Sequence, residues 1–160
     1  EAPHGPEGLL YPGTCRRLPM AERDALIAAG TPYALRLDMA RASARAGELA
    51  WRDEMRGEMR ATPQVFGDVV LARKETPASY HLAVTVDDAL QGVSLVTRGD
   101  DLFAATHVHR LLQALLGLPT PRYRHHPLLL AKRDRAATLR DLRAAGKSAA
   151  AVRAMAGVGD

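Results

Sequence analysis

The chain has 160 residues and a mass of 17.3 kDa, which allows one modest domain or a piece of a larger one. Charged residues make up 25% and apolar residues 47%, as in ordinary globular proteins, and no apolar run approaches the ~18 residues of a membrane span. A single cysteine excludes an internal disulfide framework and fits a reducing compartment, so we expect a cytoplasmic protein without membrane contact.

Positive charge is concentrated toward the C-terminus. Residues 1–121 hold 13 basic and 15 acidic side chains, whereas residues 122–160 hold 9 basic and 3 acidic ones. The net charges of −2 and +6 add up to the +4 of the whole chain. A basic C-terminal region suits a polyanionic partner such as ATP or an RNA backbone, although a solvated helical face has the same composition.

The first part of the chain alternates between helical and extended patterns after a Gly- and Pro-rich loop over residues 1–14. The expected elements are, in chain order, a helix over 20–29 ended by Gly30, a strand over 33–37, an irregular stretch over 39–47, a polar hairpin over 48–60 around Gly57 and a strand over 69–73. These predict a small β-rich insertion over residues 33–75 within an α/β fold.

The second part is predicted to continue this alternation. We expect a strand over 80–87, an acidic turn at Asp87 and Asp88, a strand over 93–97, a helix from Asp100 or Asp101 to Leu116, and two Ala-rich helices over 138–145 and 148–156. Gly117 and the prolines after it end the longer helix. The fold class is therefore α/β with a short helical C-terminus.

Tyr80 and Arg98 are the first candidate site residues. Arg98 follows a predicted strand at its carboxyl end, where open α/β sheets usually bind their ligands. A phenol and a guanidinium pointing into one crevice suit a small molecule with a carboxylate. The alternative is structural: Tyr80 is an aromatic residue at a sheet edge, and Arg98 pairs with Asp100 or Asp101.

The same stretch carries a family resemblance. The segments YHLAVTVDD at 80–88, GV at 92–93 and RGDDL at 98–102 resemble the catalytic domain of the glutamyl-type class I aminoacyl-tRNA synthetases. The resemblance implies a Rossmann-like catalytic domain, of which this chain contains the second half. It also implies that Tyr80 and Arg98 hold a glutamate substrate.

The segment LAKRD at 130–134 resembles the second signature of class I synthetases. The resemblance implies that Lys132 contacts the phosphates of ATP, bound with Mg²⁺, and is catalytic because its positive charge stabilises the transition state. It also implies that His125 and Pro127, just upstream, bind the adenine side. An exposed Lys-Arg pair near a helix is the structural alternative. The Gly-containing turn that usually precedes this lysine is absent, so the loop is shortened or a mobile segment is missing; the chemistry favours the latter.

Tyr11 and Cys15 form a third candidate. Their Tyr-x-x-x-Cys spacing resembles the second half of the family's zinc site, whose first half is a Cys-x-Cys motif that this chain lacks. A structural zinc site needs four ligands, so zinc is expected only in a longer protein, and a lone cysteine is more often a small buried apolar residue. The His pairs 107/109 and 125/126 are spaced so that neither shares one face, and no metal site is predicted there.

The first class I signature, a His-x-Gly-His-type turn, is also absent, so we expect this chain to be part of a longer protein. The predicted segments are 1–32, resembling the zinc-binding region; 33–75, the β-rich insertion; 76–135, the second half of the catalytic domain with its signature loop; and 136–160, a short helical C-terminal segment.

Only 28 residues follow Lys132, too few for an anticodon-binding domain, which resembles the truncated members of the family. That resemblance implies a ligase that activates glutamate as glutamyl-adenylate and transfers it to the queuosine base of tRNA(Asp), whose anticodon loop enters the catalytic pocket of a monomer. Two alternatives remain open: a fragment of a discriminating glutamyl-tRNA synthetase, which charges the tRNA 3′ end, or a non-catalytic nucleotide- or RNA-binding module.

Overall fold

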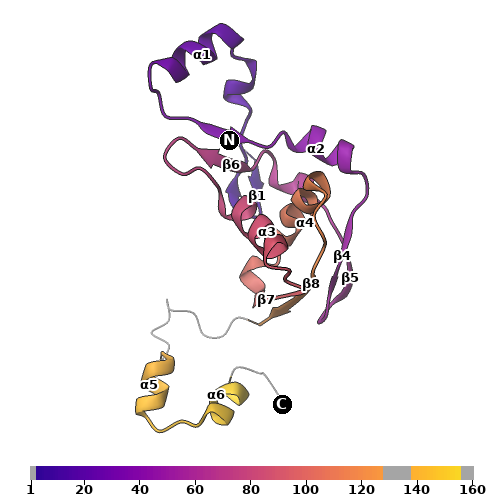
Figure 1. Cartoon of the computed structure of the whole chain (residues 1–160), viewed down its shortest axis with the longest axis vertical. Coiled ribbons are helices and arrows are strands. Elements are labelled where there is room, and N and C mark those ends of the chain that lie inside the picture. The colour runs from indigo at the N-terminus through magenta and orange to yellow at the C-terminus, as the bar shows by residue number, and fades with distance from the viewer. Residues whose placement is uncertain (1–2, 128–137, 156–160) are drawn as a thin grey trace.

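The computed structural model describes residues 3–127 and 138–155 (Figure 1). The strands are β1 (His4–Gly5), β2 (Gly8–Leu9), β3 (Ala34–Arg36), β4 (Ala50–Asp53), β5 (Gly57–Arg60), β6 (Val70–Arg73), β7 (Leu95–Gly99) and β8 (Arg122–His126). The helices are α1 (Met20–Ala28), α2 (Met39–Ala46), α3 (Tyr80–Leu90), α4 (Ala105–Leu116), α5 (Leu139–Ala144) and α6 (Ala149–Met155), with 3-10 turns η1 (Thr14–Arg17), η2 (Pro63–Phe66) and η3 (Asp100–Leu102).

The main sheet has four strands in the order β5-β4-β8-β7. Strands β4, β8 and β7 run parallel, and β5 returns antiparallel to β4 as a hairpin. Parallel pairing of β7 with β8 places Arg98 opposite His125. Two small antiparallel pairs, β1–β2 and β3–β6, lie outside this sheet. The architecture is thus a mixed α/β fold with a parallel sheet.

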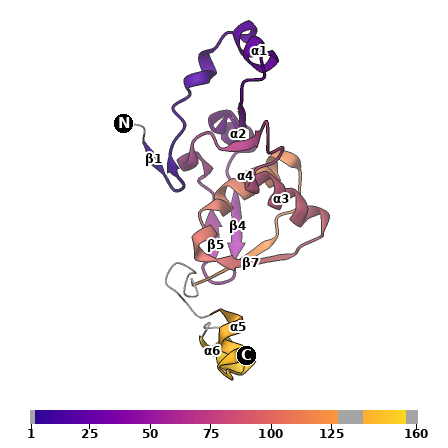
Figure 2. The same ribbon diagram turned by 90° about the vertical axis from the view of Figure 1, so that its left-hand side faces the viewer.

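The core is built around helix α4, which packs against α2 and α3 (Figure 2). Val108, Leu111 and Leu112 of α4 are almost fully buried and join an apolar cluster with residues of α2 and η2 and with Val69, directly before β6. A second cluster on the sheet centres on Trp51 and Tyr123. Burial of these side chains is the main source of stability, and the first cluster holds α4 against α2 and η2.

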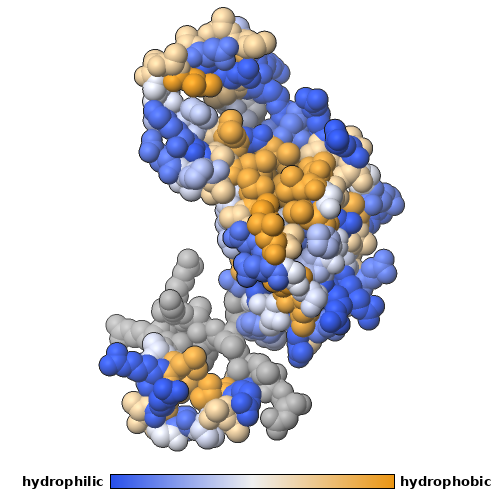
Figure 3. Space-filling view, in the orientation of Figure 1, coloured by the Kyte–Doolittle hydropathy of each residue, from blue (hydrophilic) through white to orange (hydrophobic). Residues whose placement is uncertain are grey.

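Apolar side chains are not confined to the interior. Figure 3 shows them gathered across the middle of one face, with hydrophilic side chains around them. Within residues 3–127 and 138–155, none of the helices combines the length and the apolar composition that crossing a bilayer requires.

Most of the predicted elements are confirmed. Helix α1 and strands β3, β6 and β7 overlap the predicted stretches, and the polar hairpin around Gly57 is the β4–β5 pair. Gly117 ends α4 in the left-handed conformation at φ 66°, which glycine adopts without a Cβ clash. The two short Ala-rich helices are α5 and α6, and a capping box between Thr138 and Asp141 begins the first.

The strand predicted over residues 80–87 is wrong, because this stretch forms helix α3. The hydroxyl of Ser79 accepts a hydrogen bond from the backbone N–H of Leu82 and caps the helix. The face turned to the core carries polar His81 and Thr85, which lie one turn apart and are 8% and 2% exposed. Because the buried face is polar, the alternating apolar residues resembled a half-buried strand.

The acidic turn predicted at Asp87 and Asp88 is wrong for the same reason. Both residues belong to the last turn of α3, and the chain reverses only at Gly92, whose φ of 67° suits glycine. Burial raises the pKa of Asp88 above its ordinary value, although the nearby Arg98 opposes this shift.

Two further boundaries differ from the sequence prediction. The stretch 39–47, expected to be irregular, is helix α2, which Asp38 caps by accepting the N–H of Arg41 at 3.1 Å. Asp100 and Asp101 do not cap α4: they lie in the 3-10 turn η3, and α4 begins at Ala105.

The β-rich insertion over residues 33–75 is not confirmed as a separate unit. Strand β4 from this range pairs with β8 and brings β5 with it into the main sheet, while β3 and β6 form their own pair. Pairing between β4 and β8 joins residues that are about 70 positions apart, which local sequence patterns do not encode. The division into four segments stays a prediction.

Candidate functional site

Arg98 occupies the carboxyl end of β7, as predicted, and its side chain is only 9% exposed. Its guanidinium donates from Nε to Nε2 of His125 at 3.1 Å and from Nη2 to Oγ1 of Thr106 at 2.6 Å. Nη1 contacts Nδ1 of His109 at 3.2 Å. Strand β8 and helix α4 therefore enclose the guanidinium with uncharged acceptors.

Tyr80 begins α3 and lies beside Arg98, as the sequence predicted for a common crevice. Its hydroxyl accepts a long hydrogen bond of 3.5 Å from Nη1 of Arg98, and the residue is 50% exposed. The structural alternative for Arg98 is not observed, because Asp100 pairs with Arg56 at 2.9 Å instead. In the described residues, no carboxylate lies within ion-pair distance of Arg98.

Two polar arrays hold these partners in place. On α4, Thr106, His109 and Gln113 form a buried polar stripe at spacings of three and four residues. On β8, Tyr123 and His125 point inward while the arginines between and before them are exposed. Nδ1 of His125 lies 2.5 Å from Oδ2 of Asp53, which is fully buried at the end of β4.

Burial determines the protonation of the histidines in this cluster. It lowers the pKa of His109 to about 2, with the charge of Arg98 acting in the same direction. Burial also lowers the pKa of His125, although its hydrogen bond to Asp53 opposes the shift. For Asp53, burial raises the pKa, but the hydrogen bonds from His125 and the Met55 N–H outweigh it, and the pKa lies below its ordinary value. Both imidazoles are therefore neutral at neutral pH.

We expect the stability of the protein to fall as the pH drops below about 6.5. In the unfolded chain His109 and His125 bind protons below that pH, whereas the folded state, with lowered pKa values, does not. The free energy of unfolding should therefore decrease by at most about 1.4 kcal/mol per pH unit for each histidine. Urea unfolding between pH 7.5 and 5.5 measures this slope.

A matched pair of variants assigns the slope to these residues. His109→Gln, whose amide oxygen can still accept from Arg98, should reduce the slope of unfolding free energy against pH by up to about 1.4 kcal/mol per pH unit, the contribution of one proton. Thr97→Ser, at an exposed position of β7, changes no titratable group and should leave the slope unchanged. An unfolding free energy that is constant over this pH range would contradict the neutral-histidine assignment.

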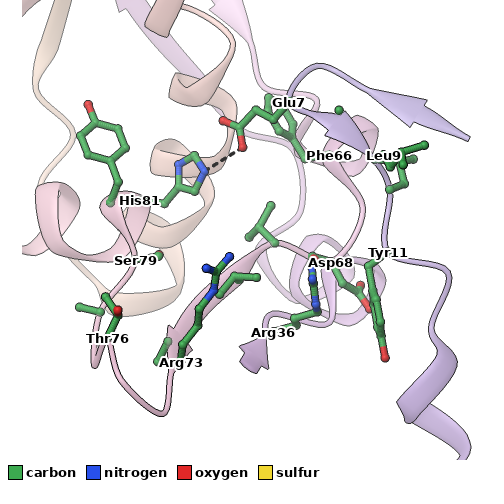
Figure 4. A pocket seen from close by; sticks show the side chains of 17 residues that line it. Glu7, Leu9, Tyr11, Arg36, Phe66, Asp68, Arg73, Thr76, Ser79 and His81 are labelled. Atoms are coloured by element: carbon green, nitrogen blue, oxygen red, sulfur yellow. Dashed lines mark hydrogen bonds and ion pairs between the residues drawn. The ribbon is translucent and has the colours of Figure 1, made fainter. Parts of the chain in front are cut away.

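A cavity of about 500 Å³ lies beside Tyr80 (Figure 4). Its lining combines cationic Arg36 and Arg73 with the carboxylates of Glu7 and Asp68, and Tyr80 and His81 close one side. The full lining runs over residues 7–11, 36, 66, 68–70, 72–73, 76 and 78–81. Arg98 does not line the cavity, but Tyr80, which does, contacts its guanidinium directly.

Tyr11 and Cys15 are close together, but the described residues do not fit a zinc site. The hydroxyl of Tyr11 accepts the backbone N–H of Cys15 at 2.8 Å, and the thiol is exposed. The guanidinium of Arg36 lies over the Tyr11 ring, 4.4 Å from its centroid. No group of three His, Cys, Asp or Glu side chains in residues 3–127 and 138–155 is arranged to hold a metal ion. Zinc at these two residues stays a prediction.

The predicted ATP-binding residues are placed only in part. Lys132 lies outside the described residues, as does the apolar run before it. Pro127 is exposed directly after β8. His125 is 2% exposed and both of its ring nitrogens already have partners, so a side-chain contact with ATP would require this hydrogen bonding to open. All three assignments stay predictions.

The sequence interpretation missed Asp53, Thr106 and Glu7, assigned no role to His81, and predicted for His109 only that it shares no metal site with His107. One signal was present: the i, i+3, i+7 spacing of Thr106, His109 and Gln113 puts three polar residues on one face of α4. No comparable local signal marks Asp53 or Glu7, whose partners His125 and His81 are 72 and 74 positions away.

Comparisons with known proteins show the family to which the sequence belongs. The family described as "tRNA synthetases class I (E and Q), catalytic domain" matches residues 5–151. A Rhodobacter capsulatus protein named glutamyl-Q tRNA(Asp) synthetase is 46% identical over 168 aligned residues. A Nocardia farcinica protein of the same name is 49% identical over 154 residues. The resemblance noted in the sequence is confirmed at the level of the family.

A solved structure agrees with the fold. The glutamate tRNA ligase of Elizabethkingia meningosepticum, in complex with its amino acid, has a TM-score of 0.61 at 26% identity, covering 78% of this chain and 27% of that chain. The chain spans 59% of the length of the Rhodobacter relative and 47% of the Nocardia relative, while 98% and 92% of the chain align.

Proposed function

Because the chain belongs to the class I glutamyl- and glutaminyl-tRNA synthetase catalytic-domain family, we propose that its protein activates glutamate with ATP and transfers it to the queuosine base of tRNA(Asp). The relatives named above, at 46% and 49% identity, support this substrate choice. The protein acts as a cytoplasmic monomer, and zinc binds only if further ligands lie outside this chain.

The main support for the proposal is that the guanidinium of Arg98 is buried without a carboxylate partner among the described residues. A buried cation is normally paired with a carboxylate, yet the hydrogen bonds of this guanidinium go only to uncharged groups among the described residues. Nη2 has two N–H bonds, and one of them has no partner in that part of the chain. A glutamate carboxylate would supply the missing charge, with Tyr80 beside it at the entrance.

The chemistry needs little from the protein beyond orientation and positive charge. A glutamate carboxylate attacks the α-phosphate of Mg²⁺-bound ATP, and pyrophosphate leaves as glutamyl-adenylate forms. Arg98 and Tyr80 orient the glutamate, and Lys132 with the strand end at His125 and Pro127 serves the ATP. A hydroxyl of the modified base then attacks the activated carbonyl and displaces AMP.

The acceptor is tested by transfer of labelled glutamate to tRNA(Asp) with and without queuosine, using tRNA whose 3′-terminal ribose is chemically blocked. We expect labelling that needs queuosine and ignores the block. It should also be strongly salt-sensitive, because Arg and Lys side chains of the basic segment from Arg122 to Arg153 neutralise phosphates and release counterions. Unmodified tRNA(Asp) is the matched control.

The second candidate is a discriminating glutamyl-tRNA synthetase, which charges the tRNA 3′ end. The similarity to the Elizabethkingia ligase, at 26% identity, favours it as the alternative. Loss of labelling on blocking the 3′ end would contradict the queuosine proposal and support a discriminating glutamyl-tRNA synthetase. Absence of glutamate-dependent ATP–pyrophosphate exchange would instead support a non-catalytic binding module.

A further inference from the structure

Two hydrogen-bonded chains of side chains begin at the guanidinium of Arg98. The first passes through one imidazole and the second through two, and each ends on a carboxylate. The first chain is short and fully buried. Nε of Arg98 donates to Nε2 of His125 at 3.1 Å, and Nδ1 of His125 lies 2.5 Å from Oδ2 of Asp53. Both His125 and Asp53 are at most 2% exposed.

The second chain is longer and reaches the cavity of Figure 4. Nη1 of Arg98 contacts Nδ1 of His109, and Nε2 of His109 lies 3.1 Å from Nδ1 of His81. Nε2 of His81 lies 3.2 Å from Oε2 of Glu7, the contact drawn as a dashed line in Figure 4. The side chain of Glu7 is half-exposed at the cavity wall, so this chain links the N-terminal segment to Arg98 through α3 and α4.

The donor-only character of arginine fixes the protons along the first chain. Because Nε of Arg98 can only donate, Nε2 of His125 must be a bare acceptor. A neutral His125 then carries its proton on Nδ1, which donates to Asp53. The other oxygen of Asp53, Oδ1, accepts the backbone N–H groups of Met55 and Arg56 at 2.8 and 3.1 Å, which holds the carboxylate in one orientation.

The protons of the second chain are fixed in the same way. Nδ1 of His109 accepts from Arg98, so His109 carries its proton on Nε2 and donates it to Nδ1 of His81. His81, accepting at Nδ1, carries a proton on Nε2 and donates it to Glu7. Protonation of either imidazole that touches Arg98 would set an N–H against a guanidinium N–H. Each carboxylate therefore selects the one tautomer that lets its chain accept from Arg98.

We propose that Asp53 and Glu7 are positioning residues for the substrate-binding arginine, acting through His125 and through the His109–His81 pair respectively. This role rests on the proposed function of Arg98 as the glutamate-binding group. The two chains accept hydrogen bonds from Nε and Nη1, and the Thr106 hydroxyl accepts one from Nη2. The guanidinium plane is therefore fixed before the substrate binds. A pre-oriented guanidinium loses less freedom on binding a carboxylate.

The proton positions are measured directly on the full-length natural protein. Nitrogen NMR of histidine-labelled protein, without glutamate, distinguishes a protonated ring nitrogen from a bare one. We expect Nδ1 protonated on His125 and Nε2 protonated on His109 and His81. An imidazolium form of His125 or His109 at neutral pH, or the opposite tautomer on either of them, would overturn the inference whatever the protein's substrate is.

Asp53→Asn tests the buried chain. The backbone N–H groups of Met55 and Arg56 hold the amide oxygen, so the amide NH₂ faces His125 and donates to Nδ1. His125 must then carry its proton on Nε2, against Nε of Arg98. We expect the NMR signals of His125 to show a bare Nδ1 and a protonated Nε2. The glutamate dissociation constant should rise about 10- to 100-fold. Glu54→Gln, the neighbouring carboxylate paired with Arg122, is the matched control and should change neither.

Glu7 provides a test that does not depend on a buried substitution. Glu7→Gln keeps an oxygen that accepts from His81, so it should retain glutamate binding, whereas Glu7→Ala removes the acceptor and should weaken binding about tenfold. Glutamate-dependent protection against thermal unfolding reports these affinities. Unchanged affinity in both Asp53→Asn and Glu7→Ala would overturn the positioning role. Wild-type protein that does not bind glutamate would overturn the proposed function itself, while the tautomer measurement still stands.

Discussion

Arg98→Lys should weaken the use of glutamate by about 2–4 kcal/mol, or roughly 30- to 1,000-fold in kcat/KM for glutamate. A lysine ammonium is a point charge. It cannot reproduce the three hydrogen bonds that the guanidinium donates to His125, His109 and Thr106. Those acceptors would stay buried without a donor, and the substrate carboxylate would lose a planar fork. Glutamate-dependent ATP–pyrophosphate exchange at varied glutamate concentration measures the effect.

Two companion variants show whether this loss belongs to the site. Tyr80→Phe removes only the long 3.5 Å hydrogen bond to Arg98 and should cost about 1 kcal/mol. Arg52→Lys changes an exposed arginine on β4 and should leave glutamate use unchanged. If Arg98→Lys kept normal glutamate dependence, Arg98 would not be part of the substrate site.

Lys132→Ala is the second large effect, and we expect about 10²- to 10³-fold slower formation of the adenylate. Positive charge at this position would be needed mainly as negative charge moves onto the leaving pyrophosphate, so turnover should fall more than glutamate affinity. Single-turnover adenylate formation separates the two quantities.

The control for Lys132→Ala is a lysine-to-alanine change outside the predicted signature. Lys74 donates to the backbone oxygen of Gly30 at the surface, and Lys74→Ala should keep the wild-type exchange rate. Pyrophosphate exchange at the wild-type rate in Lys132→Ala would count against the signature assignment, since transition-state charge stabilisation is the role it assigns to that lysine.

Recognition of the family depended on the linear motif alone. The segments at 80–88 and 98–102 led to the right family even though the first of them was assigned the wrong secondary structure. Side-chain identities at fixed spacing carry that resemblance, and they do not depend on whether Tyr80 begins a strand or a helix. The proximity of Tyr80 to Arg98 was likewise inferred correctly from a wrong local structure.

Local patterns failed where burial was polar. Helix α3 turns His81 and Thr85 to the interior, and α4 turns Thr106 and His109 there, so apolar periodicity misjudged α3 and did not reveal the site. Hydrophobic patterns locate a core only when the core is apolar. Here the polar interior is stable because its groups hydrogen-bond to one another around one guanidinium.

By itself the sequence determined the α/β class, the family, most element positions, and the pairing of Tyr80 with Arg98 as a candidate carboxylate site. Each of these rests on short-range patterns or on motif identity. Only the tertiary structure decided that Asp53 and Glu7, 45 and 91 positions before Arg98 in the chain, face it through imidazoles. Pairing of β4 with β8 brings Asp53 to His125, packing of α3 on α4 brings His81 to His109, and the N-terminal segment brings Glu7 to His81. These contacts join residues far apart in the chain, which no local pattern encodes.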